Sequence, residues 1–223
     1  MVASKKGTWT QAWVTFLSPL ILILCLRWAI VEPFVIPSES MVPNLLVHDH
    51  ILVKKFSFGL KVPFVDQWLV RWGAPQPGDI VVFKYPPNPS VYYVKRLVGL
   101  PGDKIEVRSG RILRNGQMFS YTPTPDKEFH FQEHNGLRDY TVLVHSESDD
   151  QEGTVYEVPE NQYFVMGDNR DNSSDSRVWG FVSAQFLVGK SWMIWLSCQE
   201  TLEDARFICD PLKMRWNRMF NFL

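Results

Sequence analysis

Short β-forming runs recur along most of this chain, and no other feature limits its fold so strongly. Each run is rich in Val, Ile, Tyr and Phe and is bounded by Gly, Pro, Asn or Asp, which favour turns. After the N-terminal region no long amphipathic helix is evident. The sequence therefore predicts a mainly β fold with an antiparallel sheet as its core. The main runs are HDHILVKKF, GDIVVFKY, SVYYVKRLVGL, DKIEVRS, RILRNGQ, DYTVLVH, YEVPE and QYFVMG.

Two turn dipeptides punctuate the middle of the chain. Ser109-Gly110 lies within the run Val107–Arg114, and Asn115-Gly116 follows it directly. Such dipeptides favour tight two-residue turns between antiparallel strands. The sequence therefore predicts a hairpin or meander in this region.

The character of the chain changes between about Phe119 and Thr154. This stretch is more polar and is interrupted by prolines and charges, as in TPTPDKEFHFQEHNG and HSESDDQEG. It predicts an inserted β-rich subdomain or a set of long loops. We expect a β core of residues 32–104 and 155–200, an insertion of residues 105–154 and a C-terminal tail of residues 201–223.

An uncharged apolar stretch lies near the N-terminus, from Trp13 to Leu26. With the apolar residues on either side it approaches the ~20 residues that cross a bilayer as a helix. Lys5 and Lys6 precede it and favour a cytoplasmic N-terminus. Arg27 follows it, where a charge near the helix end can reach the membrane interface. We therefore expect residues 1–31 to form a cytoplasmic N-terminus and one transmembrane signal-anchor.

Two alternatives to a signal-anchor are open. A cleaved signal peptide would have a similar start, but no A-x-A site follows the apolar stretch. A buried core helix is the other alternative. With a signal-anchor, everything after about Val31 lies on the outer face of the membrane.

The charge of the chain excludes a broad nucleic-acid footprint. Its 23 Lys and Arg balance 24 Asp and Glu, and no basic run occurs. The C-terminal segment PLKMRWNRMFNFL mixes bases with Trp216, Phe220 and Phe222. It either lies against the membrane surface or packs onto the body of the protein.

Cysteine and histidine give no metal-binding pattern, and no cofactor is expected. Cys25 lies in the apolar stretch, whereas Cys198 and Cys209 lie near the C-terminus. The latter two either close a short loop in an oxidising compartment or remain free thiols. The five histidines have no zinc-type spacing, although His48 and His50 alternate on a predicted strand.

Three polar stretches are candidates for chemistry. In the first, PSESMVP, Ser38 and Ser40 lie two residues apart beside prolines, which is also typical of a simple turn. In the second, YYVKRLVGLPGD, alternation puts Tyr93, Lys95 and Leu97 on one face of a strand. A lysine pointing into an apolar pocket has a lowered pKa, so its neutral amine accepts a serine proton. An exposed strand lysine is the commoner alternative.

The third stretch is the polar loop GDNRDNSSDSRVWGF, residues 167–181. Its aspartates and arginines are able to form ion pairs with one another. Its Asp and Asn side chains are also able to form Asx turns with the nearby backbone. A solvated surface loop or a calcium loop are the alternatives. The aspartate spacing does not match an EF-hand, and two arginines argue against a cation site.

Taken in order, these stretches resemble the type I signal peptidases (leader peptidases), a family of Ser–Lys serine proteases. The resemblance runs through LRWAIVEPF, IPSESMVP, GDIVVFKYP, VKRLVGLPGD and GDNRDNSSDSRVWGFV. It implies a membrane-bound endopeptidase that cleaves N-terminal signal peptides from exported preproteins after small residues. It also implies a catalytic domain on the outer face of the plasma (inner) membrane, near the export translocon.

The resemblance assigns roles to four residues. Ser40 is expected to be the nucleophile and Lys95 the general base. The Ser38 hydroxyl, with the backbone N–H of Ser40, is expected to form the oxyanion hole. Ser173 is expected to hydrogen-bond and orient the Lys95 amine.

Other residues are implied to support this site. Asp175 with Arg177, and Asp168 with Arg170, are expected to pair and hold the loop against Lys95, and Arg96 is expected to be architectural. The substrate is expected to add as an extended strand over shallow pockets that favour Ala-like residues at the first and third positions before the cut. The expected substrate-binding residues are Phe34, Ile36, Met41, Leu45, Tyr93 and Val94.

The sequence departs from the family pattern at two positions. Glu39 stands where glycine is common, and Asn44 where threonine is common.

Two other functions compete with the resemblance: a repressor-type Ser–Lys autoprotease, and an inactive membrane-bound binding or assembly protein. The anchor and the polar loop argue against the first, and the presence of all four site residues argues against the second.

Overall fold

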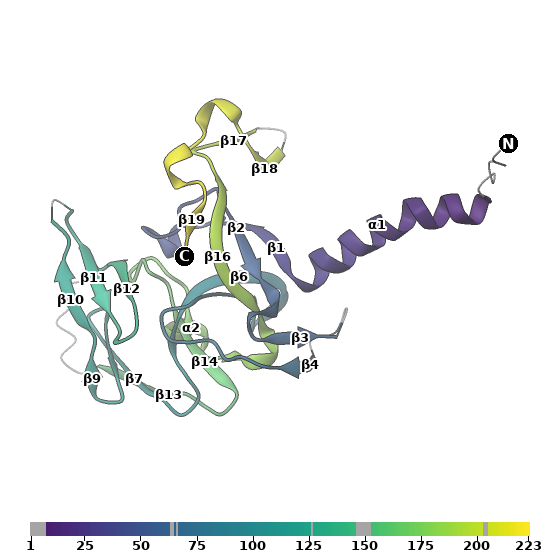
Figure 1. Ribbon diagram of the computed structural model, residues 1–223. Coiled ribbons are helices and arrows are strands. Elements are labelled where there is room, and N and C mark those ends of the chain that lie inside the picture. The colour runs from purple at the N-terminus through teal and green to yellow at the C-terminus, as the bar shows by residue number, and fades with distance from the viewer. Residues whose placement is uncertain (1–7, 63–64, 66, 126, 146–152, 203–204) are drawn as a thin grey trace.

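A large antiparallel sheet forms the body of the protein (Figure 1). The computed structural model describes residues 8–62, 65, 67–125, 127–145, 153–202 and 205–223. The strand order is β1-β2-β16-β5-β6-β14-β15, and β19 also pairs with β16. Its strands are β1 (Val31–Val35), β2 (Asp49–Lys54), β5 (Ile80–Tyr85), β6 (Asn88–Gly99), β14 (Gln162–Met166), β15 (Val182–Ser183), β16 (Leu187–Ser197) and β19 (Asn221–Phe222).

Four smaller sheets surround this body. One has the order β13-β7-β8-β9, another β10-β11-β12, and the pairs β3-β4 and β17-β18 are hairpins. Every strand pair in the named sheets is antiparallel, so the prediction of a mainly antiparallel β fold is confirmed. The strands are β3 (Gly59–Lys61), β4 (Trp68–Arg71), β7 (Lys104–Arg108), β8 (Arg111–Arg114), β9 (Gln117–Met118), β10 (Ser120–Pro123), β11 (His130–His134), β12 (Asp139–Leu143), β13 (Thr154–Glu157), β17 (Thr201–Leu202) and β18 (Ala205–Cys209).

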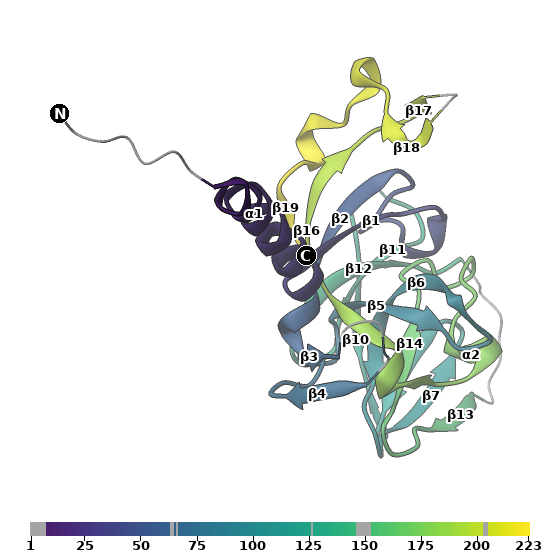
Figure 2. The same ribbon diagram turned by 90° about the vertical axis from the view of Figure 1, so that its right-hand side faces the viewer.

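The β17–β18 hairpin stands at one end of the body, and β7 and β13 lie toward the other (Figures 1 and 2). Strands β7 to β13 cover most of the predicted insertion, residues 105–154, although residues 126 and 146–152 lie outside the described chain. The division of the chain into domains stays a prediction.

Two tight turns explain the meander β7-β8-β9. The first turn has positive φ at Ser109 (45°) and Gly110 (73°), and the second at Asn115 (54°) and Gly116 (80°). Positive φ at both central residues is the type I′ geometry that matches the twist of a hairpin. The predicted meander is therefore confirmed.

Two α-helices are described, α1 (Trp9–Ala29) and α2 (Ser176–Trp179), along with five short 3₁₀ segments. Helix α1 projects away from the β body (Figures 1 and 2). The sequence predicts a membrane-spanning helix here. Among the described residues, however, no helix is both long enough and apolar enough to cross a bilayer. The 3₁₀ segments are Glu39–Met41, Lys55–Ser57, Ala184–Phe186, Pro211–Lys213 and Trp216–Arg218.

Apolar side chains cover both faces of the large sheet. Strand β5 alternates between them, because Ile80 and Val82 belong to one cluster and Val81 and Phe83 to the other. In the β5–β6 ladder Lys95 is directly opposite Val81, so Lys95 shares a face with that second cluster. The first cluster contains Ile36, Met41, Leu45, Ile51, Val53, Ile80, Val82, Val188 and Ile194. The second contains Phe58, Val81, Phe83, Leu97, Tyr163, Val165, Val182, Ala184 and Leu187.

The C-terminal tail packs onto the body, which is one of the two predicted alternatives. The backbone N–H of Phe220 donates to the Ile194 carbonyl at 2.7 Å, and that of Leu223 donates to the Trp192 carbonyl at 3.0 Å. The Leu223 side chain packs against the first cluster. The tail thereby extends the large sheet along β16.

Candidate active site

A serine and a lysine meet at one face of the large sheet. Ser40 lies on the 3₁₀ turn Glu39–Met41 between β1 and β2, and Lys95 lies in β6. The Lys95 Nζ donates a hydrogen bond to the Ser40 Oγ at 2.5 Å. Lys95 is only 4% exposed, and Ser40 is half-buried. The structure thus brings together the two residues expected to be nucleophile and base.

Burial changes the acid–base behaviour of Lys95. Loss of solvation lowers its pKa from 10.5 to about 8, although the charges of Asp175 and Asp168 oppose the shift. The Arg177 charge adds to the lowering. The Tyr93 ring lies 5.5 Å from the Lys95 Nζ. A neutral amine is therefore accessible near physiological pH, as a general base requires.

Ser38 lies beside Ser40 on the exposed side of the turn. Its Oγ is 3.3 Å from the Ser40 Oγ. Ser38 immediately precedes the 3₁₀ turn and has an extended backbone. Its side chain makes no capping hydrogen bond to that turn. Its hydroxyl is therefore close enough to donate a hydrogen bond to a group bound at Ser40.

The polar loop after β14 docks onto the backbone around Ser40. The Asn169 N–H donates to the Ser40 carbonyl at 3.1 Å, and the Asn169 side-chain amide donates to the Glu39 carbonyl at 3.3 Å. A Cβ at Gly167 would collide with the Ser40 carbonyl oxygen and the Ser173 Oγ. Glycine at position 167 therefore allows the loop to approach the turn this closely.

The Ser173 hydroxyl is buried beside Gly167 and the Asp175 carboxylate. Among the described residues, no hydrogen bond joins this hydroxyl to Lys95. Its expected orienting contact with the Lys95 amine stays a prediction.

Asp175 and Arg177 pair as the sequence predicts. The Arg177 Nε and Nη2 each donate to an Asp175 oxygen at 2.8 Å, and the Asp175 carboxylate also accepts the Gly167 N–H at 2.9 Å. Burial raises the pKa of Asp175, but the hydrogen bonds and charge of Arg177 outweigh it and hold that pKa below its ordinary value. A fixed negative charge therefore lies near Lys95.

The predicted pairing of Asp168 with Arg170 is wrong. Asp168 accepts two hydrogen bonds from Arg96, both at 2.6 Å, and Arg170 instead pairs with Glu133 at 2.6 Å. Both arginines are buried, and a buried guanidinium needs its own anion. Arg96 and Arg170 each take a carboxylate from a distant segment, so all of these residues still support the loop.

Three supporting residues had no assigned role in the sequence prediction. Asn44 donates to Asp168 at 2.7 Å and to the Thr141 carbonyl at 2.6 Å. Glu133 accepts a hydrogen bond from Tyr140 at 2.6 Å, and the Tyr140 ring lies 3.8 Å from the Arg96 guanidinium carbon. Of these three residues, only Asn44 gave a signal in the sequence, because it departs from the family pattern. Glu133 and Tyr140 lie in the predicted insertion and gave none.

The expected substrate-binding residues differ in accessibility. Phe34 and Val94 are half-buried at the edge of the first cluster, and the Phe34 ring meets Tyr92 edge-on at 5.3 Å. Tyr93 is half-buried on the opposite face of β6. The part of these three residues in substrate binding stays a prediction. The other three form the wall behind them and are at most 2% exposed: Ile36, Met41 and Leu45.

A serine hydroxyl hydrogen-bonded to a buried lysine amine is an arrangement of the serine hydrolase class. The sequence matches the family described as signal peptidase, peptidase S26, over residues 9–196. The chain belongs to this family and is a serine endopeptidase.

Two relatives agree with this assignment at the level of sequence. The chain is 40% identical over 204 residues to Signal peptidase I of Pseudomonas fluorescens, covering 83% of this chain and 72% of that protein. It is 36% identical over 225 residues to Signal peptidase I of Rickettsia canadensis, covering 90% and 85%. A crystal structure of a signal peptidase I from Enterococcus faecalis aligns with a TM-score of 0.36 at 31% identity, covering 53% of this chain and 97% of that one.

Proposed function

We propose that this endopeptidase removes N-terminal signal peptides from exported preproteins, with Ser40 as nucleophile and Lys95 as general base. The 2.5 Å contact between the Lys95 Nζ and the Ser40 Oγ carries the proposal. The names of the relatives supply the substrate class.

Catalysis begins when the neutral Lys95 amine takes the Ser40 proton. The Ser40 Oγ then attacks the scissile carbonyl carbon and forms a tetrahedral intermediate. The Ser38 hydroxyl and the Ser40 backbone N–H donate to the oxyanion, which stabilises developing charge. Protonated Lys95 returns its proton to the leaving amine, and the same amine later activates the water that hydrolyses the acyl-enzyme.

The loop of residues 167–180 maintains this geometry. Ser173, buried beside Asp175, lies in the loop that approaches Ser40, and we assign it the role of orienting the Lys95 amine. The Asp175–Arg177 pair and the Asp168–Arg96 pair hold the loop in a fixed position relative to β6.

The preprotein binds as an extended strand beside β1 and β6. Phe34, Val94 and Tyr93 are accessible enough to contact it, and Ile36, Met41 and Leu45 limit the depth of the pockets. Shallow apolar pockets favour Ala-like side chains at the first and third positions before the cut. Glu39 is exposed and its carboxylate is 3.5 Å from the Asn172 amide, so it lies on the solvent side of the turn.

The N-terminal helix attaches the catalytic body to the outer face of the plasma membrane, near the translocon. The exposed side chains of Trp13, Phe16 and Leu20 on α1 support an affinity for lipid. Flotation of the full chain with liposomes, compared with a chain lacking residues 1–30, tests this part of the proposal. Equal flotation of the two would contradict it.

Cleavage of a preprotein by the full chain in detergent tests the catalytic assignment. Ser40→Ala and Lys95→Ala should each abolish cleavage. Ser174→Ala and Lys104→Ala, at exposed positions, are matched controls that should keep it. Cleavage that survives either substitution at the proposed dyad would overturn the assignment.

A further inference from the structure

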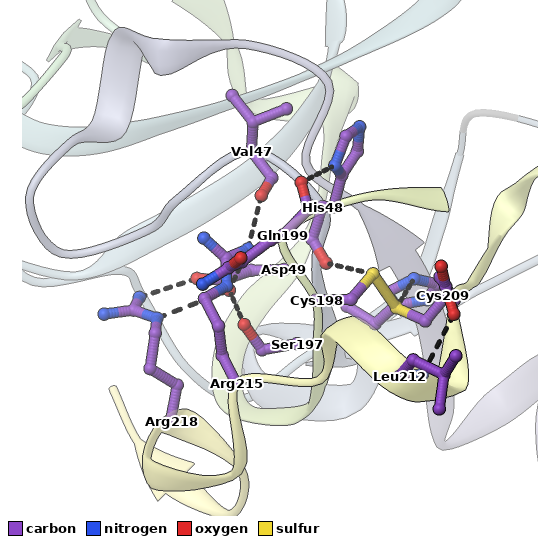
Figure 3. Close-up of a disulfide and its surroundings, with 12 residues drawn as sticks. Val47, His48, Asp49, Ser197, Cys198, Gln199, Cys209, Leu212, Arg215 and Arg218 are labelled. Atoms are coloured by element: carbon purple, nitrogen blue, oxygen red, sulfur yellow. Dashed lines mark hydrogen bonds and ion pairs between the residues drawn. A yellow bond between two sulfur atoms is a disulfide. The ribbon is translucent and has the colours of Figure 1, made fainter. Parts of the chain in front are cut away.

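Two cysteines and a histidine converge at the end of the body that carries the β17–β18 hairpin. Cys198 directly follows β16, Cys209 ends β18, and His50 lies in β2. The two cysteines form a disulfide with their Cα atoms 5.6 Å apart (Figure 3). One ligand atom from each of the three residues lies within 4.8 Å of the others, and all three residues are buried.

The spacing of these atoms suits a tetrahedral metal site. The His50 Nε2 is 3.6 Å from the Cys209 Sγ. With Zn–S near ~2.3 Å and Zn–N near ~2.0 Å, a thiolate sulfur and an imidazole nitrogen on one tetrahedral zinc ion lie roughly 3.6 Å apart. The His50 Nε2 and the Cys209 Sγ are therefore already separated as two zinc ligands would be, whereas the two sulfur atoms must separate to roughly 3.8 Å.

Neighbouring polar groups are engaged elsewhere. Asp49 accepts hydrogen bonds from Ser197 at 2.6 Å and from Arg218 at 2.6 Å, as Figure 3 shows. The His48 Nδ1 lies 3.2 Å from the Gln199 carbonyl oxygen. Among the described residues, Cys198, Cys209 and His50 therefore offer three ligand atoms, and an ion bound by them would need a water molecule as its fourth ligand.

We propose that the reduced protein binds one zinc-class divalent cation through the sulfur atoms of Cys198 and Cys209 and the Nε2 of His50. A phosphine reductant breaks the S–S bond by supplying two electrons, and it is oxidised to the phosphine oxide with oxygen from water. Two thiols result, and each loses its proton as its sulfur coordinates the metal. Because the same sulfur atoms form either the disulfide or the metal bonds, the two states exclude each other.

The two states tie the same elements together. Cys198 is also bridged to Met214, and Arg215, next in the chain, donates to the Val47 carbonyl at 2.5 Å. A metal at this site would link β18 to β16, as the disulfide does, and would add β2 through His50. No cysteine or histidine spacing in the sequence indicated this site, because strand pairing brings the ligands together.

Cobalt titration of the full chain in detergent tests the proposal. After phosphine reduction and removal of the reductant without oxygen, the wild type should bind one Co²⁺ per chain with a thiolate charge-transfer absorption that Zn²⁺ abolishes. The disulfide form should give no such absorption. Cys209→Ser should abolish it, and His50→Gln should weaken Co²⁺ binding by about tenfold or more. Cys25→Ser and His48→Gln are matched controls that should behave as wild type.

A second measurement needs no variant and so does not depend on variant folding. Zn²⁺ should protect Cys198 and Cys209 of the reduced wild type from alkylation, while leaving Cys25 unprotected. The proposal is overturned if the reduced wild type gives no thiolate absorption or no protection. It is also overturned if the disulfide form binds equally well or if His50→Gln binds as wild type.

Discussion

Asp168 and Arg96 form a buried bidentate ion pair in which both nitrogen–oxygen distances are 2.6 Å. Arg96 directly follows Lys95 in β6, so the two side chains point to opposite faces of the strand. Asp168 therefore anchors, from one face, the strand that presents Lys95 on the other.

The first prediction concerns this pair. Asp168→Asn leaves the Arg96 charge buried without its anion, so the free energy of unfolding should fall by about 3–5 kcal/mol. Urea unfolding measures the loss. The matched control is Asp139→Asn, which alters an exposed side-chain contact with His134 and should cost less than about 1 kcal/mol. Equal losses in the two variants would contradict the role of the buried pair.

The pH dependence of cleavage should report the ionisation of Lys95. Its pKa is lowered to about 8 by burial, so the amine is mostly protonated at neutral pH. The value of kcat/KM should rise about tenfold per pH unit below that pKa and level off above it. A profile that stays flat from pH ~6 to ~8 would remove Lys95 from the role of base.

Lys95→Met should stabilise the protein while abolishing cleavage. At neutral pH the folded state holds Lys95 as a buried, poorly solvated cation, so the apolar replacement should raise the free energy of unfolding by about 1–3 kcal/mol. Denaturant unfolding at pH 7 measures this gain.

The sign of the pH effect on stability provides a check on that variant. The folded pKa of Lys95, about 8, lies below the ordinary 10.5, so the unfolded chain binds more protons between these values. Wild-type stability should therefore gain from this group as pH rises from 8 to 10.5, and Lys95→Met should lack that gain. Parallel stability curves for the two proteins in this window would contradict the buried-amine account.

Gly167→Ala should impair catalysis by displacing the loop from the nucleophile. The added methyl group would meet the Ser40 carbonyl oxygen and the Ser173 Oγ. We expect kcat to fall by about tenfold or more, since small displacements of reacting groups have large effects. Kinetics of preprotein cleavage measure the loss, and an unchanged kcat in Gly167→Ala would contradict the importance of this close approach.

Local sequence signals were sufficient for eight of the strands and for two tight turns. The eight strands are β2, β5, β6, β7, β8, β12, β13 and β14. The Ser109-Gly110 and Asn115-Gly116 dipeptides form the predicted tight turns because their backbones accept positive φ. Alternation also put Lys95 on the correct face of its strand, with Leu97. The meeting of Ser40 and Lys95 depended on family resemblance, because no spacing rule connects two such distant positions.

Long-range partners were beyond sequence reasoning. Arg170 finds its anion in Glu133, and Asp168 is shared by Arg96 and Asn44, which depends on how the insertion packs against the core. The cysteine pairing was left open by the sequence, and β16 with the C-terminal segments brings the two sulfurs together. A helix forms at the predicted N-terminal position, but its spanning character has no support among the described residues.

The pairing of β2 with β16 has a consequence for the order of events during synthesis. β2 follows closely after the Ser40 turn, whereas β16 is made only after β3 to β15 have been synthesised. Until then β2 is paired with β1 on one side and lacks β16 on the other, and such non-local pairing forms late. If Ser40 is the nucleophile that we propose, cleavage is expected to begin only once nearly all of the molecule has been synthesised.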